Sequence, residues 1–308
     1  MEKNRVVAYL QGMYRSRALD GIGRVGEYKE YLAEDFMDDE TVDEYKDDIN
    51  IVRKEILEHI VHRYMIGIDA VYLSVYAHSL EAHAIQGGDD KVFYIDELLE
   101  GLILDYLFRC VSIAYDGSKE NIVHVGKGFE RMCNACILKH EFPEPNETDL
   151  VDLAKIPRAG LDIMADYYWC IVTFLMGHEL YHLIETNESK DHARKEMMAD
   201  EFGCQCLMDL IIDGEKGRIS DRYHAFYLLY YMAPYLFFEL YVFINKYRRK
   251  HGLDGIEEEL FHARRDKVVD VLYEKTPDEF DTDEANELMN IMLDASDQLM
   301  EEVLEEKE

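Results

Sequence analysis

Two histidines and a glutamate occur together in the segment His-Glu-Leu-Tyr-His at residues 178–182. On a helix, His178 and His182 lie one turn apart on the same face, so both imidazole rings can reach one metal ion. Glu179 then lies beside a metal-bound water molecule, where its carboxylate can act as the general base. Zinc is the expected ion because it lowers the pKa of bound water towards about 7 and polarises a carbonyl group. The spacing therefore predicts zinc-dependent hydrolysis of a peptide bond, with a protein or peptide as the substrate.

The residues around this segment favour a metal site over two ordinary core histidines. Apolar residues flank the motif, with Phe-Leu-Met-Gly before it and Leu-Ile after it. The helix is therefore expected to be buried, and two imidazoles and a carboxylate are costly to bury without partners. A bound cation removes that cost.

A catalytic zinc ion needs a third protein ligand and one open coordination position. Glu196 lies 14 residues after His182, which lets the first helix end, the chain turn and a second helix return to the metal. Asp200 shares a face with Glu196, and it can accept a hydrogen bond from the outer nitrogen of a ligand histidine. Glu196 is the expected third ligand. The competing candidates near the break between the helices are Glu185, Glu188, Asp191 and His192.

The two motifs together resemble those of the gluzincin metallopeptidases, in which the third ligand is a glutamate. His-Glu-Leu-Tyr-His is followed by Glu-x-x-Ala-Asp-x-x-Gly at residues 196–203, as in the HtpX/Ste24-like, ImmA/IrrE-like and phage-exclusion Lit-like peptidases of bacteria. The resemblance covers about residues 170–206. It implies a zincin-like helical core, a catalytic base at Glu179, a supporting carboxylate at Asp200, and zinc ligands at His178, His182 and Glu196.

The subfamily within the gluzincins stays open. The membrane members carry several spans, and this chain has at most one candidate. A downstream His-Pro segment is not evident, and Phe-His-Ala-Arg-Arg at residues 261–265 is a weak match to it. The metzincin pattern is excluded, because residues 185 and 188 are both glutamate where that class has glycine and histidine.

The metal-binding residues need two adjacent helices, and the sequence predicts both. An apolar helix is expected over about residues 161–185, followed by a break at 186–189 and a second helix over 190–212. Ser189 has the side chain of a helix N-cap. This pair of helices is expected to lie antiparallel and to form the core of a metallopeptidase domain over residues 146–308.

The first half of the chain is expected to be helical as well. Apolar residues at spacings of three and four predict a long helix, or a broken pair of helices, over residues 51–86. Residues 121–126, Asn-Ile-Val-His-Val-Gly, are the best strand candidate. Two prolines mark residues 141–148 as a linker. We therefore expect a mainly α-helical fold with at most a short β element, and a helical N-terminal region of unassigned role over residues 1–145.

Residues 225–244 are 20 residues long with a single charge, Glu239, which is the length of a membrane span. Five tyrosines, Pro234 and that glutamate argue against a span, because tyrosine belongs at membrane interfaces. A buried core helix is the favoured interpretation, and a membrane span is the alternative.

The composition indicates which partners and which cellular compartment to expect. The net charge is −32, which disfavours nucleic-acid binding because phosphate backbones are also anionic. The six cysteines do not have the spacing of a disulfide framework, and Cys133 and Cys136 are expected to be small buried residues rather than half of a structural zinc site. The first 17 residues lack the apolar core of a signal peptide. We expect a cytoplasmic protein with reduced thiols. Its oligomeric state is not predicted.

One rival function comes from a different class of protein. The chain could be a non-catalytic acidic interaction protein that binds a basic partner, with a structural or relic metal site. A di-iron helical bundle ranks below both, because it uses Glu-x-x-His pairs from separate helices. For the peptidase, one aromatic or histidine side chain after the second motif is expected to stabilise the oxyanion. The candidates are Tyr223, His224, Tyr227, Tyr230 and Tyr231.

Overall fold

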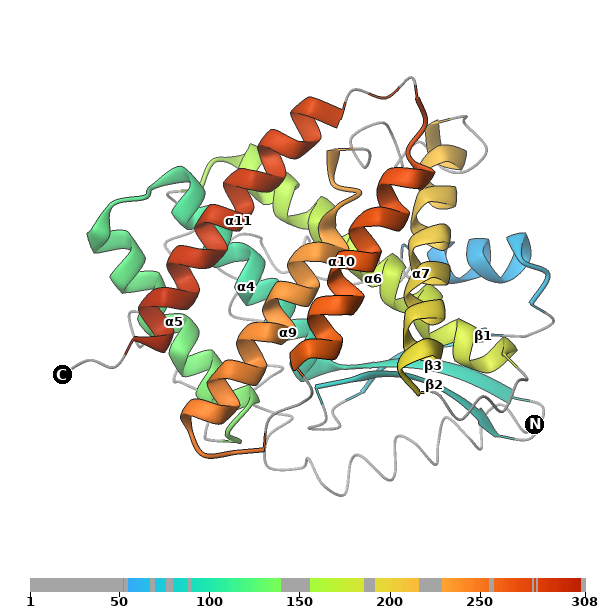
Figure 1. Cartoon of the computed structure of the whole chain (residues 1–308), viewed down its shortest axis with the longest axis horizontal. Helices are drawn as coiled ribbons and strands as arrows, with labels where there is room; N and C mark the ends of the chain where they lie inside the picture. Colours follow the sequence, from blue (N-terminus) through green and yellow to red (C-terminus); the bar gives the residue numbers. More distant parts are fainter. Residues whose placement is uncertain are drawn as a thin grey trace, which may run out of the picture.

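The computed structural model shows a mainly α-helical protein with one small sheet beneath one end of the helices (Figure 1). The fold class predicted from the sequence is confirmed. The acidic segment before residue 52, the linker at 141–148 and the break at 186–189 lie outside the described residues. The structure describes residues 52, 55–66, 70–75, 80–87, 90–139, 156–185, 192–215, 229–254, 258–278, 280 and 282–305.

The sheet has the strand order β1-β3-β2, with β3 parallel to β1 and antiparallel to β2. Phe93 and Ile95 of β3 point into the core and are 1% and 0% exposed. Among the described residues, β2 pairs on one side only, so it is an edge strand. The strands are β1 (Ala70–Val75), β2 (Ala82–Gly87) and β3 (Asp90–Asp96).

The prediction of helix over residues 51–86 is wrong beyond residue 63. Residues 55–63 are helical, but residues 70–75 form β1 and residues 82–86 lie in β2. The run Val-Tyr-Leu-Ser-Val within β1 is rich in β-branched and aromatic residues, which suit a pleated surface. Apolar spacings of three and four in so short a run do not separate strand from helix, and β3 supplies the decisive partner from outside the segment.

The strand predicted at residues 121–126 is also wrong, because these residues lie in helix α5 (Lys119–Cys136). The side chain of Ser118 accepts a hydrogen bond from the backbone of Asn121 and caps the helix. Val125 is buried against α4 (Glu97–Tyr115), and its carbonyl accepts a hydrogen bond from Arg109. A good cap and a buried stripe thus outweigh the β-propensity of a few residues.

Four helices form one half of the core. Helices α4 and α5 pack against each other and against α11, and α9 contacts both α4 and α11. The hydroxyl of Tyr106 donates to Ser296 across α4 and α11, and the ring of Phe129 stacks on Phe243 of α9. The two helices not yet bounded are α9 (Ala233–Lys250) and α11 (Thr282–Leu304).

Three helices form the other half, and α6 and α7 pack closely together within it. A side chain at Gly177 of α6 would place its Cβ 2.9 Å from the Cα of Gly203 in α7, which is closer than real Cβ atoms come. At the opposite position, a Cβ on Gly203 would lie 2.7 Å from the carbonyl oxygen of Phe174. The two glycines therefore permit the close approach. The three helices are α6 (Arg158–Ile184), α7 (His192–Glu215) and α10 (Glu258–Lys275).

The apolar segment predicted over residues 225–244 is described from residue 229, and most of α9 is buried in the core. Its glutamate, Glu239, pairs with Arg265 of α10. Among the described helices, α6 alone is long and apolar enough to cross a membrane, and 61% of its apolar window is buried within the protein. A buried core helix has the same length and composition.

The expected boundary between residues 145 and 146 falls outside the described residues. The helices before it, α4 and α5, share one hydrophobic core with α9 and α11, which follow it.

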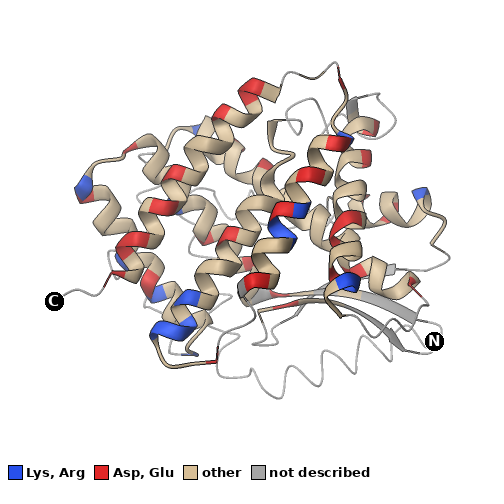
Figure 2. Ribbon diagram, in the orientation of Figure 1, with Lys and Arg blue, Asp and Glu red and all other residues tan. Residues whose placement is uncertain are grey.

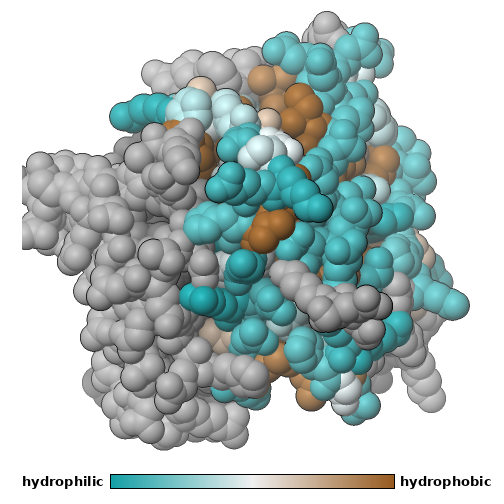
Figure 3. Space-filling view, turned by 90° about the vertical axis from the view of Figure 1, so that its left-hand side faces the viewer, coloured by the Kyte–Doolittle hydropathy of each residue, from teal (hydrophilic) through white to brown (hydrophobic). Residues whose placement is uncertain are grey.

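Acidic residues recur along the helices in Figure 2, and basic residues gather where α9 ends, at Arg248, Arg249 and Lys250. The described part of the face in Figure 3 is mostly hydrophilic, with small separate apolar spots.

Candidate metal centre

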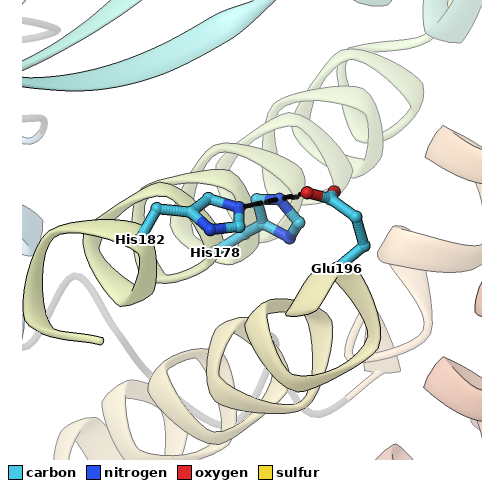
Figure 4. A group of neighbouring side chains, drawn as sticks. All are labelled: His178, His182 and Glu196. Carbon is cyan, nitrogen blue, oxygen red and sulfur yellow. Dashed lines mark hydrogen bonds and ion pairs between the residues drawn. The ribbon is translucent and has the colours of Figure 1, made fainter. Parts of the chain in front are cut away.

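The side chains of His178, His182 and Glu196 converge between α6 and α7 (Figure 4). The two histidines come from successive turns of α6, and the glutamate comes from the first half of α7. Helix α7 thus brings Glu196 to the paired imidazoles, as expected from the sequence. One ligand atom from each residue lies within 4.8 Å of the others.

The spacing of these side chains fits a small divalent cation. The Nε2 atoms of His178 and His182 are 3.2 Å apart. Nε2 of His178 lies 3.5 Å from Oε2 of Glu196, and Nε2 of His182 lies 3.5 Å from Oε1. Metal–ligand bonds of about 2.0–2.1 Å in a tetrahedron place neighbouring ligand atoms about 3.3–3.4 Å apart. Two imidazoles and one carboxylate are also a donor set of catalytic zinc sites. The residues present therefore fit a zinc ion.

Asp200 orients the first of these histidines. Its Oδ1 lies 2.8 Å from Nδ1 of His178, and the carboxylate is fully buried. Because that carboxylate accepts the hydrogen bond, Nδ1 carries the proton and Nε2 faces the cluster. The position matches the supporting role expected for Asp200.

Arg264 of α10 is a site residue that sequence reasoning missed. Its guanidinium donates to both oxygens of Asp200, at 2.7 and 2.9 Å, and its Nη1 lies 3.2 Å from Oε2 of Glu196. The rings of Phe238 and Phe261 lie about 5.4 and 5.5 Å from its central carbon. The signal in the sequence was indirect, since two acidic residues on the buried face of one helix need a cation from elsewhere.

The charges of this cluster depend on one another. Burial opposes ionisation of Glu196, but the hydrogen bond and charge of His178 and the charge of Arg264 lower its pKa to about 2. Burial likewise lowers the pKa of His178, yet its hydrogen bonds to Asp200 and Glu196 outweigh this and raise the pKa to about 9. Burial and the neighbouring His178 lower the pKa of His182. A metal ion must therefore displace a proton from His178 while it finds the glutamate already ionised.

Glu179 lies on the side of α6 that faces the sheet. Its Oε1 is 3.9 Å from Nε2 of His178, and its side chain is 13% exposed. Helix α6 contacts both β2 and β3. His83 of β2 binds Glu81 at 2.7 Å. This hydrogen bond and the charge of Glu179 raise the pKa of His83, although burial lowers it. Glu179 thus lies beside His178, and its charge also acts on His83 of the edge strand.

The competing third ligands do not match Glu196. Glu185 accepts a hydrogen bond from Tyr181 on its own helix, at 2.7 Å. His192 lies 3.7 Å from Oε1 of Glu196 and is 81% exposed, but it is not part of the three-residue group. Glu188 and Asp191 lie outside the described residues.

The tyrosines expected near the metal are only partly described, and those that are lie elsewhere. Tyr230 packs on Tyr167 in the upstream part of α6, and Tyr231 packs on Tyr273 and Phe280. Tyr223, His224 and Tyr227 lie outside the described residues.

The six cysteines are buried and unpaired with one another. None of them belongs to a metal-binding group within the described part of the chain. This agrees with their expected role as small core residues.

Comparisons with protein-family models, with curated proteins and with solved structures gave no match to this chain.

Proposed function

We propose that this protein is a zinc-dependent metallopeptidase that hydrolyses peptide bonds, with Glu179 as the general base. One observation carries the proposal: one ligand atom from each of His178, His182 and Glu196 lies within 4.8 Å of the others, with the carboxylate of Glu179 beside them. The donor set has three members, which leaves a tetrahedral ion one position for water and substrate.

A bound zinc ion supplies a Lewis acid that acidifies water and polarises the carbonyl group of the substrate. The protein supplies the proton transfers. The carboxylate of Glu179 accepts a proton from the attacking water and then delivers it to the nitrogen of the leaving amine. Asp200 and Arg264 act through other residues, because they hold His178 and Glu196 in place and keep the surrounding charge balanced.

The edge strand β2 supports an extended peptide as the substrate. Among the described residues it pairs with a neighbouring strand on one side only, and α6 packs against it. The charge of Glu179 acts on His83 of this strand. A peptide can add to such an edge through main-chain hydrogen bonds, which recognise a peptide backbone without requiring one sequence. This strand thus favours a peptide over a small-molecule ester or amide.

The test compares the parent protein with Glu179→Gln. We expect the variant to bind zinc as the parent does and to cleave no protein, because the amide cannot accept the proton. Both proteins are incubated with a cell extract, and new protein N-termini are identified by mass spectrometry. Glu201→Gln, an exposed position on α7, is the matched control and should cleave as the parent does. Equal cleavage by Glu179→Gln and the parent would overturn the proposed role of Glu179.

The rival proposal is a non-catalytic acidic protein that binds a basic partner. The net charge of −32 supports it, as do the acidic residues that recur along the helices in Figure 2. Metal analysis separates the two proposals. One zinc ion per chain, lost in His178→Ala, supports the peptidase, whereas a protein that never takes up metal supports the rival.

A further inference from the structure

The proposed catalytic site leaves one coordination position for substrate, and His192 is the imidazole nearest to its glutamate ligand outside the three-residue group. His192 is the first residue of α7, one helical turn before Glu196. Its Nδ1 lies 3.7 Å from Oε1 of Glu196, close to the 3.5 Å that separates Nε2 of His182 from the same oxygen. Residues four apart on a helix share a face, so the two side chains can bind one ion.

The surroundings of His192 leave its ring free to move. Its side chain is 81% exposed, against 7% for His178 and 30% for His182. Within the described part of the chain, the side chain of His192 has one charged partner, Glu196. Because the ring is exposed, rotating it towards or away from the metal position needs little free energy.

We propose that His192 is a displaceable fourth ligand, which closes the metal site at rest and leaves when a substrate binds. The proposal rests on the proposed function and adds a regulation to it. With four protein ligands, a zinc site has the coordination of a structural site and no place for a reacting water molecule. With three, it is open. A substrate must therefore compete with the ring of His192. The apparent affinity for the substrate then falls in proportion to the fraction of sites that are open.

The first test replaces zinc with Co²⁺, whose visible absorption reports the number and type of ligands. The parent, His192→Ala and His251→Ala are compared, the last being an exposed histidine at the end of α9. We expect His192→Ala alone to change the spectrum and to bind acetohydroxamate, a small metal-binding probe, at least about tenfold more tightly. Identical spectra and equal hydroxamate affinity in all three proteins would overturn the proposal.

The second test places a sulfur atom at the same position. His192→Cys should give a thiolate-to-cobalt charge-transfer band in the near ultraviolet that the parent lacks. The native cysteines do not interfere, because all six are buried and none belongs to the metal group. No such band would mean that residue 192 does not reach the metal. If instead the parent binds neither Zn²⁺ nor Co²⁺, the proposed function itself fails, so the two failures are distinguishable.

Discussion

Arg264 binds Asp200 through two hydrogen bonds, although 64 residues separate them in the chain. Asp200 in turn binds His178, and Arg264 also reaches Glu196. A single cation from α10 therefore connects a carboxylate of the metal-binding group with the carboxylate that orients a histidine. The three helices α6, α7 and α10 are held together at the point where the chemistry is proposed to occur.

Removing the charge of Arg264 should lower zinc affinity more than removing the charge of the adjacent Arg265. We expect Arg264→Leu to lower zinc affinity about 10- to 100-fold, because Glu196 and Asp200 lose the partner that positions them. It should also destabilise the fold by about 3 kcal/mol, since the buried carboxylate of Asp200 loses the guanidinium that binds both of its oxygens and keeps only His178 as a partner.

The control for this change is Arg265→Leu, on the same helix. Arg265 pairs with Glu239, away from the metal-binding group. Zinc affinity is measured by competition with a chelator, and stability by denaturant unfolding. Equal zinc affinity in the two variants would show that Arg264 does not position the ligands.

The sequence was sufficient to predict that His178, His182 and Glu196 lie close together, because their geometry is mostly local. The spacing of His178 and His182 is set by one helix, and Glu196 needed only a turn and a second helix. Arg264 could not be predicted in the same way, because its position depends on how α10 packs against α7. The sheet was missed for the same reason, since β1 is defined by pairing with β3 and not by its own pattern.

The close contact between α6 and α7 gives a second expectation. Gly177→Ala should destabilise the protein by about 1–3 kcal/mol, because its Cβ would meet backbone atoms of α7 that cannot easily move. Gly101→Ala is the matched control, since the nearest atom to its Cβ is a methionine methyl at 3.5 Å. Because glycine destabilises a helix interior relative to alanine, Gly101→Ala should stabilise the protein by about 0.5–1 kcal/mol. Denaturant unfolding of both variants checks the expectation, and equal changes in the two would contradict it.

A partly buried carboxyl in α6 should make stability depend on pH. Burial and the charge of Asp162 raise the pKa of Asp166 from 3.8 to about 7. The pKa of Asp166 is higher in the folded chain than in the unfolded chain. The contribution of the protonated carboxyl to the free energy of unfolding is therefore fully present below about pH 4 and is lost as the pH rises through about 7.

Asp166→Asn removes this cost of ionisation. It should stabilise the protein at pH 8 by about 2 kcal/mol, after allowance for solvent screening, and change little at pH 4. The exposed Asp294→Asn is the control and should be neutral at both pH values. Thermal unfolding is measured at each pH. A stabilisation of the same size at pH 4 and pH 8 would show that ionisation of Asp166 is not its cause.

Removing the metal should lower the stability of the parent protein by an amount that depends on zinc concentration. An ion that binds only the folded chain stabilises it by about 2.7 kcal/mol at a free concentration 100 times Kd. Addition of a chelator should therefore lower the melting temperature of the parent and of Glu201→Gln, which lies on α7 outside the metal-binding group. It should leave that of Glu196→Gln unchanged, because an amide in place of the carboxylate removes one charged ligand and the variant holds little zinc. Differential scanning calorimetry with and without chelator measures the shift. A parent whose melting temperature does not respond to zinc or chelator would argue that His178, His182 and Glu196 do not bind the metal together.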